Sequence, residues 1–406
     1  MRGGAWGRRS FRLFFLGQGI SAIGDRVVSV ALAFAVLDLT GSVKDLGLVL
    51  AAQTVPLVVF LLAGGVWADR LSRRAVMLAS DLVRAGAQGA TALLLLAGHA
   101  HVWQLAVLQA VYGMAEAFFI PASQGLLPEV VAAEDLQSAN ALIAVSANVA
   151  NVGGPALAGV LVATLGAGWG LAIDAASFLA SAAFLSLMRL DALVPAVRTG
   201  TLSELRAGWR AFRSRTWLWA SVLEFMAANA LSSPYLVLGP EVARTSLGGA
   251  AAWAAISSAS GLGAVLGGIF GLRWRPRHPL RAMFVIALIG TTPLVVLLAA
   301  TAPLALLLVA AVISGMSISF FNLVWFTVLQ HRVPGEELSR VSSWDALGSY
   351  VISPIGLAAA GPVGIALGIP ATLYGAAALG VLATAAVLAV PSVRNLADEP
   401  AAQTAA

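Results

Sequence analysis

Charge is scarce in this sequence, and cysteine is missing altogether. Only 11% of the 406 residues are charged, whereas 59% are hydrophobic. A soluble domain needs roughly a quarter charged residues to cover its surface in water. This chain therefore requires lipid as its main solvent. Without cysteine it can form neither a disulfide framework nor a cysteine-based metal site.

Lysine is almost absent as well, because Lys44 is the only one among the 24 basic residues. The sequence has no G-x-x-x-x-G-K motif, which argues against ATP-driven transport within this chain. Of the four histidines, only His99 and His101 are close together, and no third ligand is near them. We therefore expect neither a metal nor any other cofactor.

Long apolar runs fill the chain instead. A membrane-spanning helix needs about 20 mainly apolar residues, and glycine, proline or charged residues separate segments of that length here. We predict an all-α integral membrane protein with twelve spans, at residues 11–38, 45–67, 75–97, 103–122, 137–164, 168–189, 216–239, 249–271, 282–300, 303–330, 341–361 and 365–390.

The basic residues give these spans an orientation, because such residues stay mainly on the cytoplasmic side. With the N-terminus inside, 20 of the 24 basic residues fall in cytoplasmic segments. Only Lys44 and Arg244 fall outside, while Arg26 and Arg84 lie within spans. Both termini are therefore predicted to be cytoplasmic. Topology accounts for the arginines, so we expect no nucleic-acid partner.

The longest break between spans divides the chain into two halves. We predict an N-terminal six-helix bundle at 1–189, a cytoplasmic linker at 190–215, a C-terminal six-helix bundle at 216–391 and a disordered tail at 392–406. In the linker, residues 201–204 fit a helix-starting capping box, and apolar residues then recur at helical spacing. This pattern predicts an amphipathic helix on the membrane surface. We expect this helix to tether the two halves; the alternative is a regulatory or partner-binding role.

Local echoes relate the two halves. A glycine pair followed by a short basic loop occurs at residues 64–74 and again at 267–275, and a weaker echo links 154–159 with 353–358. Six spans, a connector and six spans is a repeat architecture that transporters use. Gly263, Gly267 and Gly271 also form a ridge that allows another helix to approach closely.

The sequence resembles the major facilitator superfamily at several motifs. The loop GGVWADRLSRR at 64–74 resembles that superfamily's signature between helices 2 and 3, with Ser72 in place of its second glycine. The stretch GGPALAG at 153–159 resembles the antiporter motif of drug exporters. Residues 16–42 and 118–131 are similar to exporters of the enterobactin and macrolide efflux type. The resemblance implies two pseudo-symmetric six-helix bundles, alternating access between them, and transport rather than enzyme activity.

Two groups of residues take expected roles from this resemblance. The first is a cytoplasmic gate loop that latches the halves, with Asp69 as the acceptor of charge-assisted hydrogen bonds; its members are Gly65, Asp69, Arg70, Arg73 and Arg74. A loop that only fixes topology is the alternative. The second is an antiporter-like kink in span 5, where proline removes a backbone donor and glycine removes bulk; its members are Gly154, Pro155 and Gly159. A kink for packing alone explains the same residues.

Ionisable groups inside a membrane are costly, so each is a candidate functional site. In the resembled fold, helices 1, 4, 7 and 10 line the central cavity. Our proton-coupling candidates are Asp25 first and Glu116 second, joined by Arg26 and Glu224. A buried carboxyl group can take up and release a proton at ordinary pH. The alternative is permanent neutralisation by an arginine such as Arg26 or Arg84.

Two further sets of polar residues fall inside spans. Asp81 and Arg84 are three residues apart, which predicts a structural ion pair on one helix face. Where the family's proton-relay motif would place an arginine in span 4, this chain has Gln109, so Arg26 or Arg84 would have to substitute. Amide and aromatic groups suit the cavity of a bulky amphipathic substrate, and the candidates are Asn322, Trp325, Gln330 and Tyr235. Anchoring at the bilayer interface is the alternative for the Trp and Tyr.

The function expected from these observations is secondary active transport. We expect a proton-coupled antiporter of a bacterial cytoplasmic membrane that exports small amphipathic molecules such as drugs, antibiotics or siderophores. Its partners would be the substrate, protons and the lipid bilayer, and the protein would be a monomer. A facilitator without proton coupling, or a lipid translocator of the same fold, is the alternative.

Overall fold

The computed structural model describes residues 5–188, 201–274 and 276–397. The side chains of residues 62–70, 133, 201–205, 272, 336 and 339 lie outside that description. Contacts divide the chain into two units: unit 1 comprises Met1–Val197 with Ala243–Ser258, and unit 2 comprises Arg198–Val242 with Ala259–Ala406. Each unit is described by itself.

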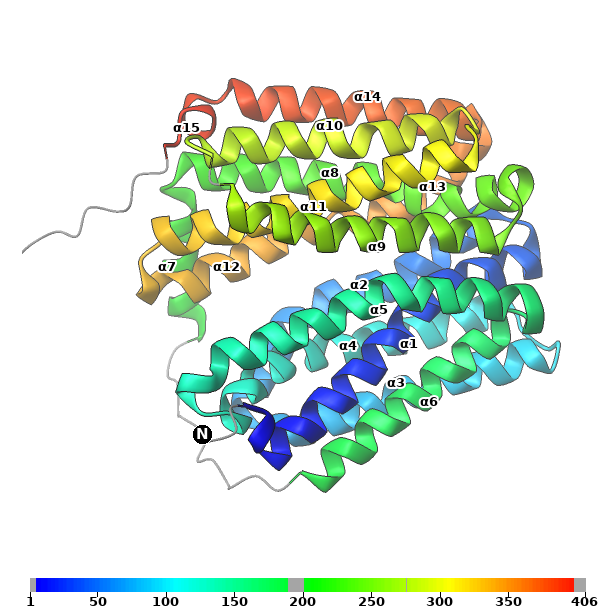
Figure 1. Ribbon diagram of the computed structural model, residues 1–406, viewed down its shortest axis with the longest axis horizontal. Coiled ribbons are helices and arrows are strands. Elements are labelled where there is room, and N and C mark those ends of the chain that lie inside the picture. The colour runs from blue at the N-terminus through cyan, green and yellow to red at the C-terminus, as the bar shows by residue number, and fades with distance from the viewer. Residues whose placement is uncertain (1–4, 189–200, 275, 398–406) are drawn as a thin grey trace, which may run out of the picture. The chain divides into compact units, whose positions relative to one another are not determined.

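Unit 1 is built from long helices that match the first six predicted spans (Figure 1). They are α1 (Arg9–Thr40), α2 (Val43–Arg70), α3 (Arg73–Leu96), α4 (Val102–Val130), α5 (Leu136–Leu165) and α6 (Ala167–Leu187), with short 3-10 turns at Ala5–Gly7 and Ala133–Asp135. Helix α1 ends at Gly41, whose left-handed conformation lets its N–H bond to the Leu37 carbonyl. Helix α4 continues past Pro121 to Val130, eight residues beyond the predicted span.

The second half of the chain begins with α7 (Thr201–Arg213), where the amphipathic helix is expected. It continues with α8 (Thr216–Val242), a π-helical turn (Ala243–Leu247), α9 (Ala250–Arg273), α10 (Pro279–Ala299), α11 (Leu304–Arg332), α12 (Gly335–Tyr350), α13 (Ser353–Leu367), α14 (Ile369–Ala389) and α15 (Pro391–Arg394). The predicted span 11 is thus two helices. The break precedes Pro354, because proline has no N–H to continue the helical ladder.

Eleven helical segments in the described part of the chain are long and apolar enough to cross a membrane, with α12 and α13 together counting as one. Helix α3 is not among them, although it is 24 residues long. It carries Asp81 and Arg84, which lower its hydropathy but are 0% and 2% exposed. Because these charges face the protein interior, α3 can serve as the twelfth helix of an all-α fold.

The two halves repeat the same helix pairings. In unit 1, α1 packs on α5 and α6, α2 on α4, and α3 on α4 and α6. In unit 2, α8 packs on α13 and α14, and α10 on α11 and α14, as Figure 1 shows for α10 and α14. Helix α9 meets α11 through the glycine ridge. Each helix of the first half therefore has a counterpart six spans later.

Glycines at equivalent crossings allow the backbones to approach closely. A Cβ on Gly154 of α5 would collide with Arg26 and Ile23 of α1, and one on Gly356 of α13 would collide with Ala230 and Ser233 of α8. The two glycines do not align within the weaker sequence echo, because Gly154 directly precedes Pro155 whereas Gly356 follows Pro354 by two residues. The two halves therefore share the close helix crossing but not the exact position of the glycine.

The glycine ridge on α9 packs directly against the backbone of α11. A Cβ on Gly267 would collide with the main chain of Met316, whereas one on the neighbouring Gly268 would meet only the Ser319 hydroxyl at an ordinary 3.7 Å. We expect Gly267→Ala to destabilise the protein by about 1–3 kcal/mol, the usual cost of overpacking. Gly268→Ala is the matched control and should leave the melting temperature in detergent unchanged. Equal melting temperatures for both variants would contradict the close contact.

Two expectations about the ends of unit 2 need correction. Helix α7 does not lie on lipid alone, because the ring of Trp209 contacts that of Trp344 of α12 in a tilted arrangement, with centres 5.0 Å apart, and Phe212 is buried in the core of unit 2. The tail is also ordered at its start, because Val393 is fully buried and Arg332 donates a hydrogen bond to the Ala397 carbonyl. Residues 189–200 of the linker and 398–406 of the tail lie outside the described residues.

Candidate functional site

A line of polar side chains runs through the interior of unit 1, where a membrane protein would otherwise be apolar. We call it the polar seam, and it comprises Asp25, Asp81, Arg84, Gln88, Gln109, Tyr112, Glu116, Asp174, Ser177 and Ser181. Helix α1 supplies Asp25, and helices α3, α4 and α6 supply the other members at intervals of three or four residues, so the members from each of these three helices share one face. Helices α3, α4 and α6 each pack against a neighbour that also contributes to the seam.

Asp25 is the central carboxyl group of the seam. Its Oδ1 accepts a hydrogen bond of 2.8 Å from the Tyr112 hydroxyl, across 87 residues of sequence. Asp25 also lies within electrostatic range of Glu116 and Asp174. Its side chain is partly exposed, whereas that of Tyr112 is buried. Asp25 can therefore be reached from outside the packed core while it remains bonded to the seam.

Glu116 lies one turn along α4 from Tyr112, with Gln53 of α2 beside it. The close approach of α2 is possible because Gly113 faces the Gln53 carbonyl, where a Cβ would collide. The Oε2 atom of Glu116 is buried and has no hydrogen-bonding partner among the described residues. A buried carboxylate oxygen without a donor is costly, so this carboxyl group is better suited to carrying a proton than to permanent charge.

The structure brings Asp81 and Arg84 together as their spacing predicts. Arg84 Nη2 lies 2.5 Å from Asp81 Oδ1. The guanidinium also lies between two aromatic rings, 3.9 Å from the centre of Phe119 and 4.2 Å from that of Phe178. Such cation–π contacts favour a buried arginine over a lysine. Arg84 is therefore held inside unit 1 by one ion pair and two ring contacts.

Several further members of the seam, among them Gln88, Ser177 and Ser181, were not identified from the sequence. Gln109 donates to Gln88 at 3.1 Å, Ser177 bonds to Asp174, and Ser181 lies beside Asp81. The available signal is the spacing: polar residues recur at intervals of three, four and seven residues on α3, α4 and α6. Read helix by helix, that spacing predicts a polar face inside the bundle.

The charge of the seam is unbalanced. Four carboxyl groups, from Asp25, Asp81, Glu116 and Asp174, share the field of one buried guanidinium, that of Arg84. Arg26 is exposed, and no ion pair joins it to Asp25 among the described residues. Uncompensated charge in an apolar interior is strongly unfavourable. The buried carboxyl groups of the seam are therefore candidates for binding protons.

Arg73 and Arg74 of the gate loop bind within unit 1. Arg73 bonds to the Gly125 carbonyl at 2.7 Å and to Glu129 at 2.8 Å, and Arg74 bonds to the carbonyls of Leu185 and Ser186. Cations are favourable at helix C-terminal ends, where carbonyls are unpaired. These two residues therefore hold the ends of α4 and α6. The surroundings of Gly65 and of the Asp69 and Arg70 side chains lie outside the part of the chain that the structure describes.

The candidates of the antiporter-like kink lie at a helix crossing. Gly154 and Pro155 are buried, and Gly154 packs under Arg26 of α1. Gly159 packs against Ala254 at the start of α9. This contact explains why residues 243–258 associate with unit 1, although the sequence places them in the second half.

The candidates in unit 2 are distributed over helices α8 and α11. Glu224 accepts a hydrogen bond of 3.1 Å from Thr384 of α14. Trp325 is 3% exposed and donates a hydrogen bond of 2.9 Å to Asp345, so it is packed in the core of unit 2. The remaining candidates are exposed on α11 or partly buried on α8; they are Asn322, Gln330 and Tyr235.

The helix pairings that repeat in the two halves are those of the major facilitator fold. The solved structure of the nucleoside transporter NupG has this fold, with a TM-score of 0.77 over 94% of this chain and 98% of that chain, at 14% identity.

The sequence then places the chain within that class: it belongs to the family described as transmembrane secretion effector, which it matches over residues 6–405. It is 29% identical to the multidrug efflux pump Tap of Mycolicibacterium fortuitum over 92% of this chain and 93% of that protein. It is 27% identical to the enterobactin exporter EntS of Escherichia coli O1:K1 / APEC, over 86% and 85%. The resemblance to drug and siderophore exporters is thereby confirmed.

Proposed function

We propose that this protein exports small amphipathic molecules from a bacterial cell in exchange for protons. The family and the names of its relatives support export. The observation that carries proton coupling is the polar seam, in which four carboxyl groups share one buried guanidinium. A carboxyl group that binds a proton in an apolar interior can release it when its surroundings change.

The proposed cycle uses Asp25 as the accessible proton carrier. A proton entering from outside protonates Asp25 or Glu116, and release to the cytoplasm resets the transporter. The two six-helix halves rock about a central site, as repeat transporters do. Tyr112 holds Asp25 in position through its 2.8 Å hydrogen bond, so that the proton is transferred at a defined place.

The hydrogen bond of Tyr112 can be tested without altering any charge. We expect Tyr112→Phe to slow proton-driven export roughly tenfold, because a hydrogen bond to a charged group contributes about 1.5 kcal/mol or more. The assay is drug or dye efflux from cells or inside-out vesicles energised by a pH gradient. Tyr374→Phe is the matched control, since Tyr374 is 42% exposed. If both variants export at the wild-type rate, Tyr112 has no role in positioning Asp25.

A further inference from the structure

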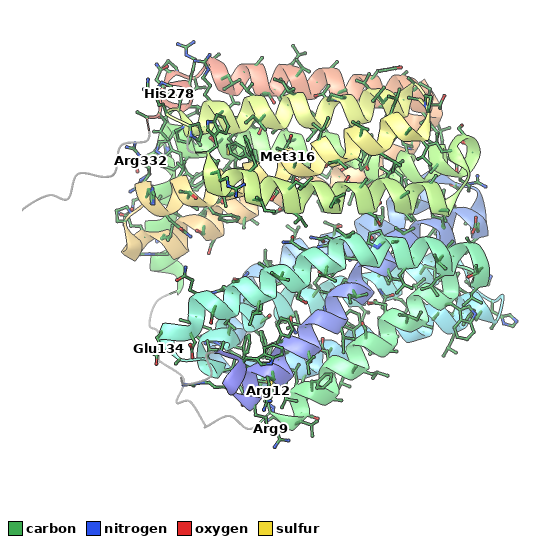
Figure 2. All side chains as sticks on the ribbon, viewed as in Figure 1. Arg9, Arg12, Glu134, His278, Met316 and Arg332 are labelled. Carbon is green, nitrogen blue, oxygen red and sulfur yellow. The ribbon has the colours of Figure 1, made fainter. Side chains whose placement is uncertain are left out.

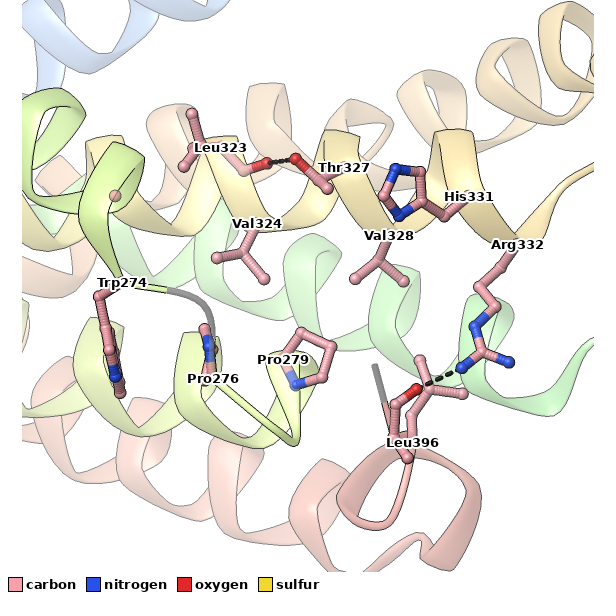
Figure 3. Close-up of a pocket in the computed structure, with 12 residues that line it drawn as sticks. Trp274, Pro276, Pro279, Leu323, Val324, Thr327, Val328, His331, Arg332 and Leu396 are labelled. Atoms are coloured by element: carbon pink, nitrogen blue, oxygen red, sulfur yellow. Dashed lines mark hydrogen bonds between the residues drawn. The ribbon is translucent and has the colours of Figure 1, made fainter. Parts of the chain in front are cut away.

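A cavity of about 290 Å³ lies at one end of unit 2, apart from the polar seam (Figure 3). Its walls come from the end of α9, the start of α10, the last three turns of α11 and the ordered tail. Val324 and Val328 form an apolar floor, and Arg332 and His331 lie at one edge. The cavity therefore combines an apolar interior with a cationic edge.

The surroundings of this cavity are basic. No acidic residue is among the twelve that line it. The loop between α9 and α10 passes its mouth and exposes Arg273, Arg277 and His278, and Arg281 follows on the first turn of α10. Figure 2 shows His278 and Arg332 at the same end of unit 2. The positive-inside rule predicts that this end faces the cytoplasm, where anionic lipids collect.

A second cavity of about 200 Å³ continues the apolar surface deeper along α11. It is lined by Ile286, Ile289, Ile313 and Met316, among others, and the exposed Ile289 and Ile313 mark its side as lipid-facing. Met316 lies 12 residues before Val328, which is ~18 Å along the helix at 1.5 Å per residue. That distance is close to the hydrocarbon depth of one leaflet, about 15 Å.

An aromatic wall connects the two cavities. Trp274 borders the first cavity and stacks on Phe320 of the second at 5.3 Å, and Phe270 contacts both rings at 5.5 and 5.8 Å. Tryptophan is typical of the headgroup level of a bilayer. The surface therefore changes from cationic to aromatic to aliphatic. This order matches the phosphate headgroup, the interfacial region and the acyl chains of a phospholipid.

We propose that this surface is a binding site for an anionic phospholipid of the cytoplasmic leaflet. The lipid phosphate pairs with Arg332, Arg273 and Arg277, and an acyl chain lies along α11 toward Met316. Arg332 also donates to the Ala397 carbonyl, and this bond uses only one of its five N–H groups. Lipid binding at Arg332 would thus also fix the ordered tail.

The test uses the full-length protein in detergent. Thermal stability is measured against added phosphatidylglycerol, phosphatidylcholine or inorganic phosphate, and co-purified lipid is counted by native mass spectrometry. We expect phosphatidylglycerol alone to raise the melting temperature. Arg332→Gln should weaken that effect roughly fivefold in lipid concentration, because one arginine near a membrane surface contributes about that factor. The control variant Arg213→Gln, which replaces an exposed arginine of α7, should leave the effect of phosphatidylglycerol unchanged.

A second variant tests the cavity without changing charge. Thr327→Trp places an indole in the first cavity and should abolish the retained lipid, whereas Leu306→Trp, at an exposed site near the other end of α11, should leave it. Stabilisation by inorganic phosphate alone would assign the site to a free anion and overturn the proposal. Equal effects of both phospholipids, or unchanged binding in Arg332→Gln and Thr327→Trp, would also overturn it.

Discussion

Replacing Arg84 by methionine should prevent the protein from accumulating in folded form. The substitution leaves Asp81 buried, at 0% exposure, without the guanidinium that lies 2.5 Å away. Removing one partner of a buried ion pair typically costs about 3–5 kcal/mol. The two ring contacts with Phe119 and Phe178 are lost as well. Size-exclusion profiles and melting temperatures of the membrane-extracted protein measure the effect.

The double variant Asp81→Asn with Arg84→Met identifies the cause. Because it removes both charges together, it should recover much of the folded protein that the single variant loses. Arg73→Gln is the control for an arginine of a more exposed pair, since Arg73 is 32% exposed, and it should cost less than about 1 kcal/mol. A single Arg84→Met variant as stable as the wild type would contradict the buried pair.

Replacing Asp25 by asparagine should uncouple transport from the proton gradient. Asparagine retains an oxygen that can accept the hydrogen bond from Tyr112, but it cannot exchange a proton. We expect uphill export driven by a pH gradient to fall roughly 100-fold, the lower end of losses when a proton-transferring group is removed. Downhill exchange of substrate should persist, because the helix packing is unchanged. Both are measured in inside-out vesicles.

The matched control for Asp25→Asn is Glu134→Gln, which neutralises an exposed acid outside the seam. It should export like the wild type. If Asp25→Asn retains gradient-driven export while Glu116→Gln loses it, Glu116 is the proton carrier and Asp25 only holds Tyr112. If neither variant loses it, the buried acids of unit 1 have structural roles.

Much of the fold follows from the sequence, because each span is a local feature. About 20 apolar residues must form a helix in lipid, whatever their neighbours are. The glycine ridge on α9 was also predictable, since small residues at every fourth position allow close packing. The break before Pro354 was missed because hydropathy alone does not show it, although the proline itself is a signal.

The site was harder to predict because it depends on contacts between distant segments. Asp81 and Arg84 share one helix, so their spacing was enough. The bond between Tyr112 and Asp25 joins two helices whose packing the sequence does not specify, and Tyr112 was therefore overlooked. Trp325 suggested a substrate cavity, yet it packs in the core and bonds to Asp345. Residue type indicates that a group needs a partner, but tertiary packing decides which one.

Proton movement by the wild-type protein tests the central claim most directly. Purified transporter is reconstituted in proteoliposomes that contain a pH-sensitive dye, and an amphipathic substrate gradient is imposed without any initial pH gradient. Coupled exchange predicts that substrate efflux drives protons the opposite way, and that Asp25→Asn abolishes the dye signal while substrate still moves. Substrate flux with no proton movement in the wild type would contradict the account.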